Sequence, residues 1–125
     1  MAPRGPFHAA PPSAAPPVPA TLPDGFLAAL RRRLDALYGD RLVRAVLFGS
    51  YARGEATEDS DVDVLVVLSG AVDSWEEYRR LSEITVDFLG EYDQFVTFVV
   101  ADEERAGRPW TFMRNVREDG VPLAT

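Results

Sequence analysis

The sequence predicts an α/β fold, in which a small sheet carries helices, within a single domain. Its 125 residues are enough for one compact core and too few for a second catalytic domain. The hydrophobic content of 46% is sufficient to build that core. Apolar runs of strand length also alternate with segments whose apolar residues recur at helical spacing, and this alternation favours a layered α/β arrangement.

The amino-terminal segment differs from the rest in composition. The first 23 residues contain eight of the ten prolines, together with many alanines and few large apolar side chains. Such a segment buries too little surface to offset its ordering entropy, so we expect a disordered tail at 1–22 and a folded domain at 23–125. No stretch approaches the ~20 apolar residues of a membrane span, and we expect a soluble, cytoplasmic protein.

The expected elements follow one another without an internal repeat. Asp24 is placed to cap a first helix from Phe26 to Tyr38, which Gly39 would end. Each later element is predicted from its own apolar pattern or turn residues. These elements are a strand at 42–48, a short helix at 50–53, a strand at 62–68, a helix at 74–89, a strand at 95–100, a helical turn at 102–105 and a helix at 109–118.

Composition excludes several kinds of chemistry. The absence of cysteine rules out disulfides, thiol catalysis and thiolate metal sites. His8 is the only histidine and lies in the expected tail, so no general-base histidine is expected. The net charge of −7 repels nucleic acid, and direct nucleic-acid binding by the isolated domain is not expected.

A glycine-serine pair directly follows the first expected strand. Gly49 lets a ligand approach the main chain closely, and Ser50 adds a hydroxyl donor at the start of a short helix that Gly54 closes. The first N–H groups of a helix are free and favour an anion. The turn is therefore a candidate phosphate site, although a Gly-Ser pair alone is common.

Two aspartates mark the start of the second expected strand. Asp61 and Asp63 lie two residues apart, so their carboxylates point to the same face. Two such charges repel unless a cation lies between them, and Mg²⁺ prefers oxygen ligands of this kind. The alternative is a polar turn formed by Asp59, Ser60 and Asp61, which leaves Asp63 unexplained.

Residues 49–54 (Gly-Ser-x-x-x-Gly) and 60–63 (Ser-Asp-x-Asp) form a compound motif. In this combination the chain resembles the minimal nucleotidyltransferase (MNT) domain of the DNA polymerase beta superfamily, best known from HEPN–MNT toxin–antitoxin pairs. The similarity extends from about Asp24 to Leu123, and residues 47–68 carry its specific part.

The resemblance implies a small mixed sheet flanked by helices. It also implies transfer of a nucleoside monophosphate, most simply AMP, from magnesium–NTP to an acceptor hydroxyl, with a HEPN-type toxin as the partner. Residues matching the family's phosphate turn, Gly49 and Ser50, would hold the triphosphate of ATP. Residues matching its acidic pair, Asp61 and Asp63, would hold Mg²⁺ and serve catalysis.

Further candidates lie beside these motifs. Arg53 suits bidentate contact with phosphate, and an ion pair with Glu55 or Asp59 is an equal alternative. Ser60 belongs to the motif and is a candidate nucleotide contact. Active family members usually carry a third carboxylate on a neighbouring strand, for which Asp93 is the nearest candidate, a turn residue being the alternative.

Two function classes therefore stay open. The third expected strand and the residue before it offer only Thr97 and Gln94 as polar side chains, so the third carboxylate is not evident. An enzyme is favoured by the intact pair of Asp61 and Asp63, since a scaffold has no need for adjacent like charges. A nucleotide-binding or toxin-neutralising subunit with little or no catalysis is favoured by the missing third acid.

Overall fold

The computed structural model describes residues 20–109 and 111–123, which form a four-stranded mixed sheet with helices on both faces. The strand order is β3-β2-β1-β4. β1 runs antiparallel to β2 and to β4, and β2 runs parallel to β3, so the expected mixed sheet is confirmed. The strands are β1 (Leu42–Phe48), β2 (Val62–Leu68), β3 (Val96–Asp102) and β4 (Val121–Pro122).

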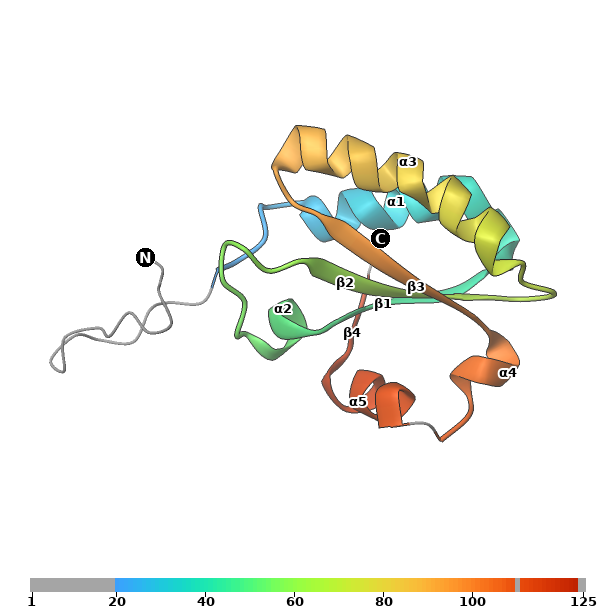
Figure 1. The fold of residues 1–125 in the computed structure, drawn as a ribbon. Coiled ribbons are helices and arrows are strands. Elements are labelled where there is room, and N and C mark those ends of the chain that lie inside the picture. The colour runs from blue at the N-terminus through green and yellow to red at the C-terminus, as the bar shows by residue number, and fades with distance from the viewer. Residues whose placement is uncertain (1–19, 110, 124–125) are drawn as a thin grey trace, which may run out of the picture.

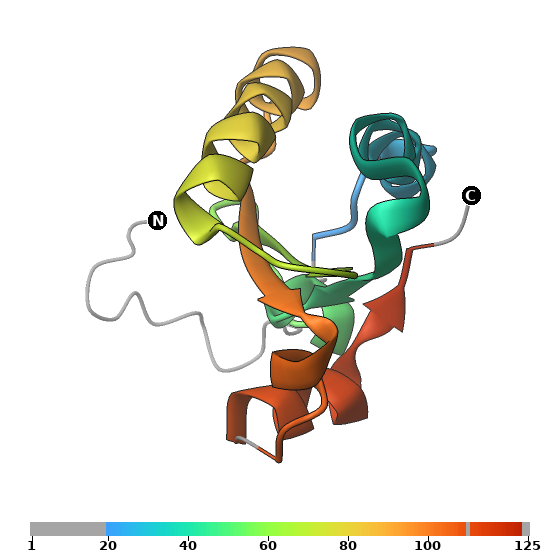
Figure 2. The same cartoon turned by 90° about the vertical axis from the view of Figure 1, so that its right-hand side faces the viewer.

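The helices divide between the two faces of the sheet. α1 and α3 cover one face, α4 and α5 lie against the other, and α2 lies where β1 ends (Figures 1 and 2). Of these, α3 is the longest described helix, and Asp73 caps it by accepting a hydrogen bond from Glu76 N. The helices are α1 (Phe26–Tyr38), the 3-10 helix η1 (Gly39–Arg41), α2 (Ser50–Arg53), α3 (Ser74–Tyr92), α4 (Glu103–Ala106) and α5 (Thr111–Asp119).

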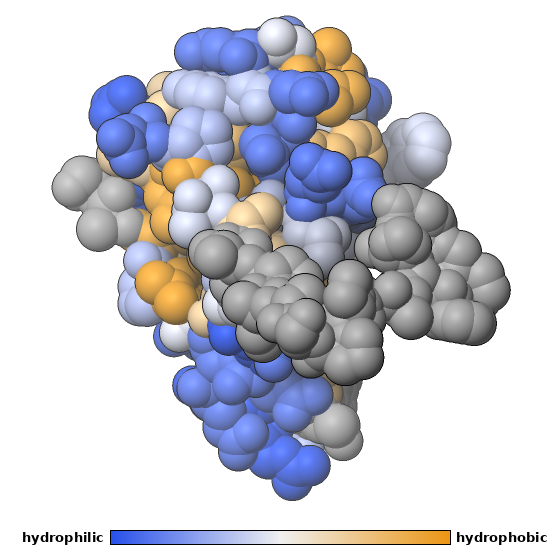
Figure 3. Space-filling view, turned by 90° about the vertical axis from the view of Figure 1, so that its left-hand side faces the viewer, coloured by the Kyte–Doolittle hydropathy of each residue, from blue (hydrophilic) through white to orange (hydrophobic). Residues whose placement is uncertain are grey.

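Side-chain alternation along β2 creates two cores, one on each face. Val62, Val64 and Val66 are fully buried and pack with residues of α1 and α3, whereas Leu65 and Val67 pack with α4 and α5. On the second face, α5 contributes buried Met113 and Val116, and its outer surface is hydrophilic (Figure 3). Burial on both faces of the sheet therefore explains why β2 is apolar at nearly every position.

Several expected boundaries differ from the structure. Gly25, not Asp24, occupies the N-cap of α1, because Phe26 N donates to Pro23 O in a tight turn and Gly25 takes a φ of 77°. The helix expected at 74–89 continues to Tyr92, and the strand expected at 95–100 spans 96–102. β4 was not expected at all, since two residues carry no periodic signal and form a strand only by pairing with β1.

The expected tail boundary also moves. Residues 20–22 belong to the folded part, because Ala20 N donates to Ala56 O at 2.8 Å and Leu22 packs on the larger core. Residues 1–19, and with them the prediction of disorder for most of the tail, lie outside the described residues. Among the described helices, none combines the length and the apolar character needed to cross a membrane.

Candidate active site

Gly49 joins β1 to α2 in a conformation that suits only glycine. Its φ of 79° and ψ of −158° lie in a region essentially closed to other residues. A Cβ at this position would overlap Asp63 Oδ2 and lie 3.2 Å from Asp63 Cγ. The turn between β1 and α2 therefore passes directly against the Asp63 carboxylate, which places the candidate phosphate site and the candidate metal ligand side by side.

The short helix α2 is held firmly after this turn. Arg53 N donates to Gly49 O at 3.1 Å, and Gly54 ends the helix in the left-handed conformation with a φ of 72°. Tyr51 packs on the larger core and donates its hydroxyl to Gln94 Oε1 at 3.2 Å. The half-buried Ser50 makes no side-chain hydrogen bond within the described part of the chain, so its hydroxyl remains available to a ligand.

Strand register brings Asp63 between two neighbours. Its Cα partners are Phe48 on β1 and Thr97 on β3. Thr97 Oγ1 donates to Asp63 Oδ1 at 2.6 Å, a short distance typical of a hydroxyl bonded to an ionised carboxylate. The sequence showed Thr97 as a polar residue in an apolar strand, but its contact with Asp63 depends on a register that the sequence does not reveal.

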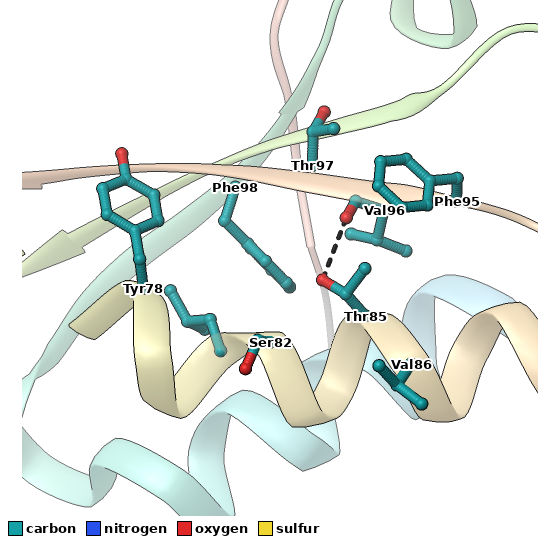
Figure 4. A pocket seen from close by; sticks show the side chains of 9 residues that line it. Tyr78, Ser82, Thr85, Val86, Phe95, Val96, Thr97 and Phe98 are labelled. Atoms are coloured by element: carbon teal, nitrogen blue, oxygen red, sulfur yellow. Dashed lines mark hydrogen bonds between the residues drawn. The ribbon is translucent and has the colours of Figure 1, made fainter. Parts of the chain in front are cut away.

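The site lies on the sheet face opposite α1 and α3. Figure 4 shows Val96 and Phe98 directed toward α3, whereas Thr97 leaves β3 on the other side. Figure 4 also shows a depression of about 290 Å³ between α3 and β3, which is separate from the site and is lined largely by apolar residues of these two elements. On the site's own face, the rings of Phe48 and Phe112 meet edge to face at 5.2 Å, so α5 borders the site.

Asp61 is the other residue of the predicted acidic pair. It is exposed, immediately precedes β2 and forms no hydrogen bond or ion pair with any described residue. The carboxylates of Asp61 and Asp63 provide hard oxygen ligands, and the missing side chain of Gly49 allows Asp63 Oδ2 to lie directly against the turn. This donor set fits Mg²⁺ held by one or two carboxylates together with substrate phosphates.

A third carboxylate does not join this pair. Among residues 20–109 and 111–123, no three acidic or histidine side chains gather in a group that could hold a metal ion. Asp93 is exposed and forms the C-cap of α3 with a φ of 57°, a conformation that short polar residues tolerate. The C-cap conformation supports the interpretation of Asp93 as a turn residue. No observation on the described residues supports Asp93 as a metal ligand.

Arg53 and Ser60 both have partners in the structure. Arg53 Nε lies 3.0 Å from Glu55 Oε1, and both side chains are exposed. Such a pair contributes about 0–1 kcal/mol, so a phosphate can compete for this guanidinium. Ser60 Oγ accepts from Thr57 N at 2.9 Å and thereby closes the turn before β2.

Comparison with known proteins identifies the family of this chain. The family model described as a nucleotidyltransferase domain matches residues 27–121, most of the described chain. The chain belongs to the nucleotidyltransferase family. The protein is therefore an enzyme of the nucleotidyltransferase class, as the combined motifs indicated.

Individual relatives give the same family. The nucleotidyltransferase is 37% identical over 92 residues to a protein of Methanocaldococcus jannaschii named as a candidate protein adenylyltransferase, covering 72% of this chain and 86% of the relative. It is 34% identical over 93 residues to protein adenylyltransferase MntA of Thermococcus cleftensis, covering 74% and 88% of the two chains. A crystal structure of a toxin–antitoxin complex with AMP-PNP contains a chain of the same fold, with a TM-score of 0.59, 21% identity and coverage of 79% and 73%.

Proposed function

We propose that this nucleotidyltransferase binds magnesium–ATP and transfers AMP to a side-chain hydroxyl of a partner protein. The observation that carries this proposal is the contact between the Gly49 turn and the Asp63 carboxylate. A triphosphate bound at the turn would lie beside the two aspartates, which is the arrangement that nucleotidyl transfer requires.

Each part of the site has a distinct task in this proposal. The N–H groups after Gly49 and the Ser50 hydroxyl would hold phosphate oxygens, and Arg53 would add a guanidinium after leaving Glu55. Asp61 and Asp63 would hold Mg²⁺, which, when bound, supplies charge neutralisation at the phosphates. The acceptor oxygen then bonds to the α-phosphorus as the bond to pyrophosphate breaks, and the hydroxyl proton leaves to a base.

Support for AMP as the transferred group comes from the two relatives named as protein adenylyltransferases. Each relative is more than 30% identical to this chain, and the alignment covers most of the relative's length. Support for a toxin partner is the shared fold with a chain of a toxin–antitoxin complex, together with the motif resemblance to HEPN–MNT pairs. We therefore propose a HEPN-type protein as the acceptor and this chain as its antitoxin.

A nucleotide-binding subunit with little or no catalysis is the second candidate function. The observation that favours it is that no third carboxylate joins Asp61 and Asp63 within the described residues. The two candidates differ in one measurable respect, since only the enzyme leaves a covalent nucleotide on its partner.

The test is co-expression of the nucleotidyltransferase with its toxin partner, followed by intact-mass analysis of the partner. The enzyme proposal predicts that the partner gains the mass of one or more AMP groups with the wild-type protein and none with Asp63→Asn. An unmodified partner, beside wild-type protein that binds magnesium–ATP, would leave the binding subunit as the function.

A further inference from the structure

Asp63 is contacted from two sides, by Thr97 of β3 and by Gly49, which directly follows β1. From β3, Thr97 Oγ1 donates to Oδ1 at 2.6 Å. From the end of β1, the bare Cα of Gly49 lies against Oδ2, because any Cβ there would overlap that oxygen. The carboxylate therefore has one oxygen bound by a donor and the other at the phosphate turn.

Thr97 stands at a position where an acidic side chain would lie beside Asp63. It is the direct Cα partner of Asp63 across the parallel β2–β3 pair, and its side chain leaves β3 on the face away from α3 (Figure 4). A hydroxyl at this position stabilises the carboxylate by donating to it, whereas a second carboxylate would repel it. The Thr97 hydroxyl thus fixes the Asp63 carboxylate in place without adding negative charge to the site.

We propose that Thr97 is a positioning residue, which orients the Asp63 carboxylate so that Oδ2 faces the metal and the triphosphate bound at the Gly49 turn. The inference rests on the proposed function, since it concerns the same site. Groups that hydrogen-bond metal ligands orient those ligands, and their loss typically reduces metal affinity by roughly 10–100-fold.

A purely structural role for Thr97 makes a different prediction. Thr97 is β-branched and half-buried in a strand, so shape alone could account for it. Thr97→Val keeps the branched shape and removes the hydroxyl, whereas Thr97→Ser keeps the hydroxyl and removes a methyl group. If Thr97 acts only through packing, valine is the better replacement; if it positions Asp63, serine is.

The experiment measures ATP affinity by calorimetry for the full-length wild-type, Thr97→Val and Thr97→Ser proteins, each with Mg²⁺ and with EDTA, beside their melting temperatures. We expect Thr97→Val to weaken the magnesium-dependent affinity about tenfold or more, with little change in EDTA, and Thr97→Ser to stay close to wild type. Melting temperatures should stay within a few degrees for both variants.

Two results would overturn the role of Thr97: unchanged magnesium-dependent binding by Thr97→Val, or a loss with Thr97→Ser as large as with Thr97→Val. A wild-type protein that shows no magnesium-dependent ATP binding would instead contradict the proposed function itself. The first two results leave the proposed function standing, so the two failures are distinguishable.

Discussion

Replacement of Gly49 by alanine tests the link between the phosphate turn and the acidic pair. The new Cβ would overlap Asp63 Oδ2, and the backbone at Gly49 has a φ of 79° that alanine tolerates poorly. Strain of this kind costs roughly 1–3 kcal/mol. Displacing the carboxylate also breaks its hydrogen bond with Thr97, and a bond to a charged group contributes about 1.5–3 kcal/mol.

The sum, roughly 2.5–6 kcal/mol, is a large part of the stability of a small domain. Gly54 provides the matched control, because it has a similar φ of 72° at the other end of α2 but open space around its Cα. Gly54→Ala should cost only about 1–2 kcal/mol, the usual penalty of the left-handed conformation.

Urea unfolding at low temperature measures both variants, and calorimetry measures their magnesium–ATP binding. We expect Gly49→Ala to be clearly less stable than Gly54→Ala and to lose nucleotide binding, while Gly54→Ala retains it. Equal stability of the two variants, with wild-type nucleotide affinity in Gly49→Ala, would show that the turn and Asp63 do not form one site.

Three further predictions concern the acidic pair, the amino-terminal segment and the buried acid of α3. Asp63→Asn should weaken magnesium–ATP binding and abolish transfer, with a melting temperature within a few degrees of wild type because asparagine keeps the shape and can still accept the hydrogen bond from Thr97; full activity would contradict it. Deletion of 1–19 should leave thermal stability unchanged, whereas deletion of 1–22 removes Leu22 from the core and should lower it by several degrees in a melting experiment. Glu77→Gln should destabilise the fold by roughly 1–2 kcal/mol, because Glu77 is only 3% exposed and forms ion pairs with two arginines. Urea unfolding measures this change, and unchanged stability would show that the ion pairs contribute nothing.

Much of the fold was predictable because its strands are marked by local sequence. The expected ranges 42–48 and 62–68 coincide with β1 and β2. In β2, apolar branched residues buried on both faces leave a nearly continuous pattern, and in β1 the apolar run Ala45–Phe48 ends at the Gly49 turn. β4 was missed because pairing with β1, not its own two residues, makes it a strand. The cap of α1 was misplaced because Gly25 adopts a left-handed conformation that Asp24 does not indicate.

The candidate site was predictable in part for a related reason. The placement of Asp63 within β2 and of Gly49 directly after β1 follows from local sequence. The same-face placement of Asp61, which lies before β2, stays a prediction from strand geometry. The hydrogen bond between Thr97 and Asp63 joins residues 34 positions apart and depends on the register of two parallel strands. Local pattern contains no information about that register, so Thr97 could be noticed but not assigned.

The most direct test of the central claim is the intact mass of a HEPN-type partner after incubation with the purified nucleotidyltransferase, ATP and Mg²⁺. We expect the partner to gain the mass of AMP with the wild-type protein, the gain to require Mg²⁺, and Asp63→Asn to produce none. A partner that stays unmodified, in a reaction where the wild-type protein binds magnesium–ATP, would contradict the claim that this site transfers AMP.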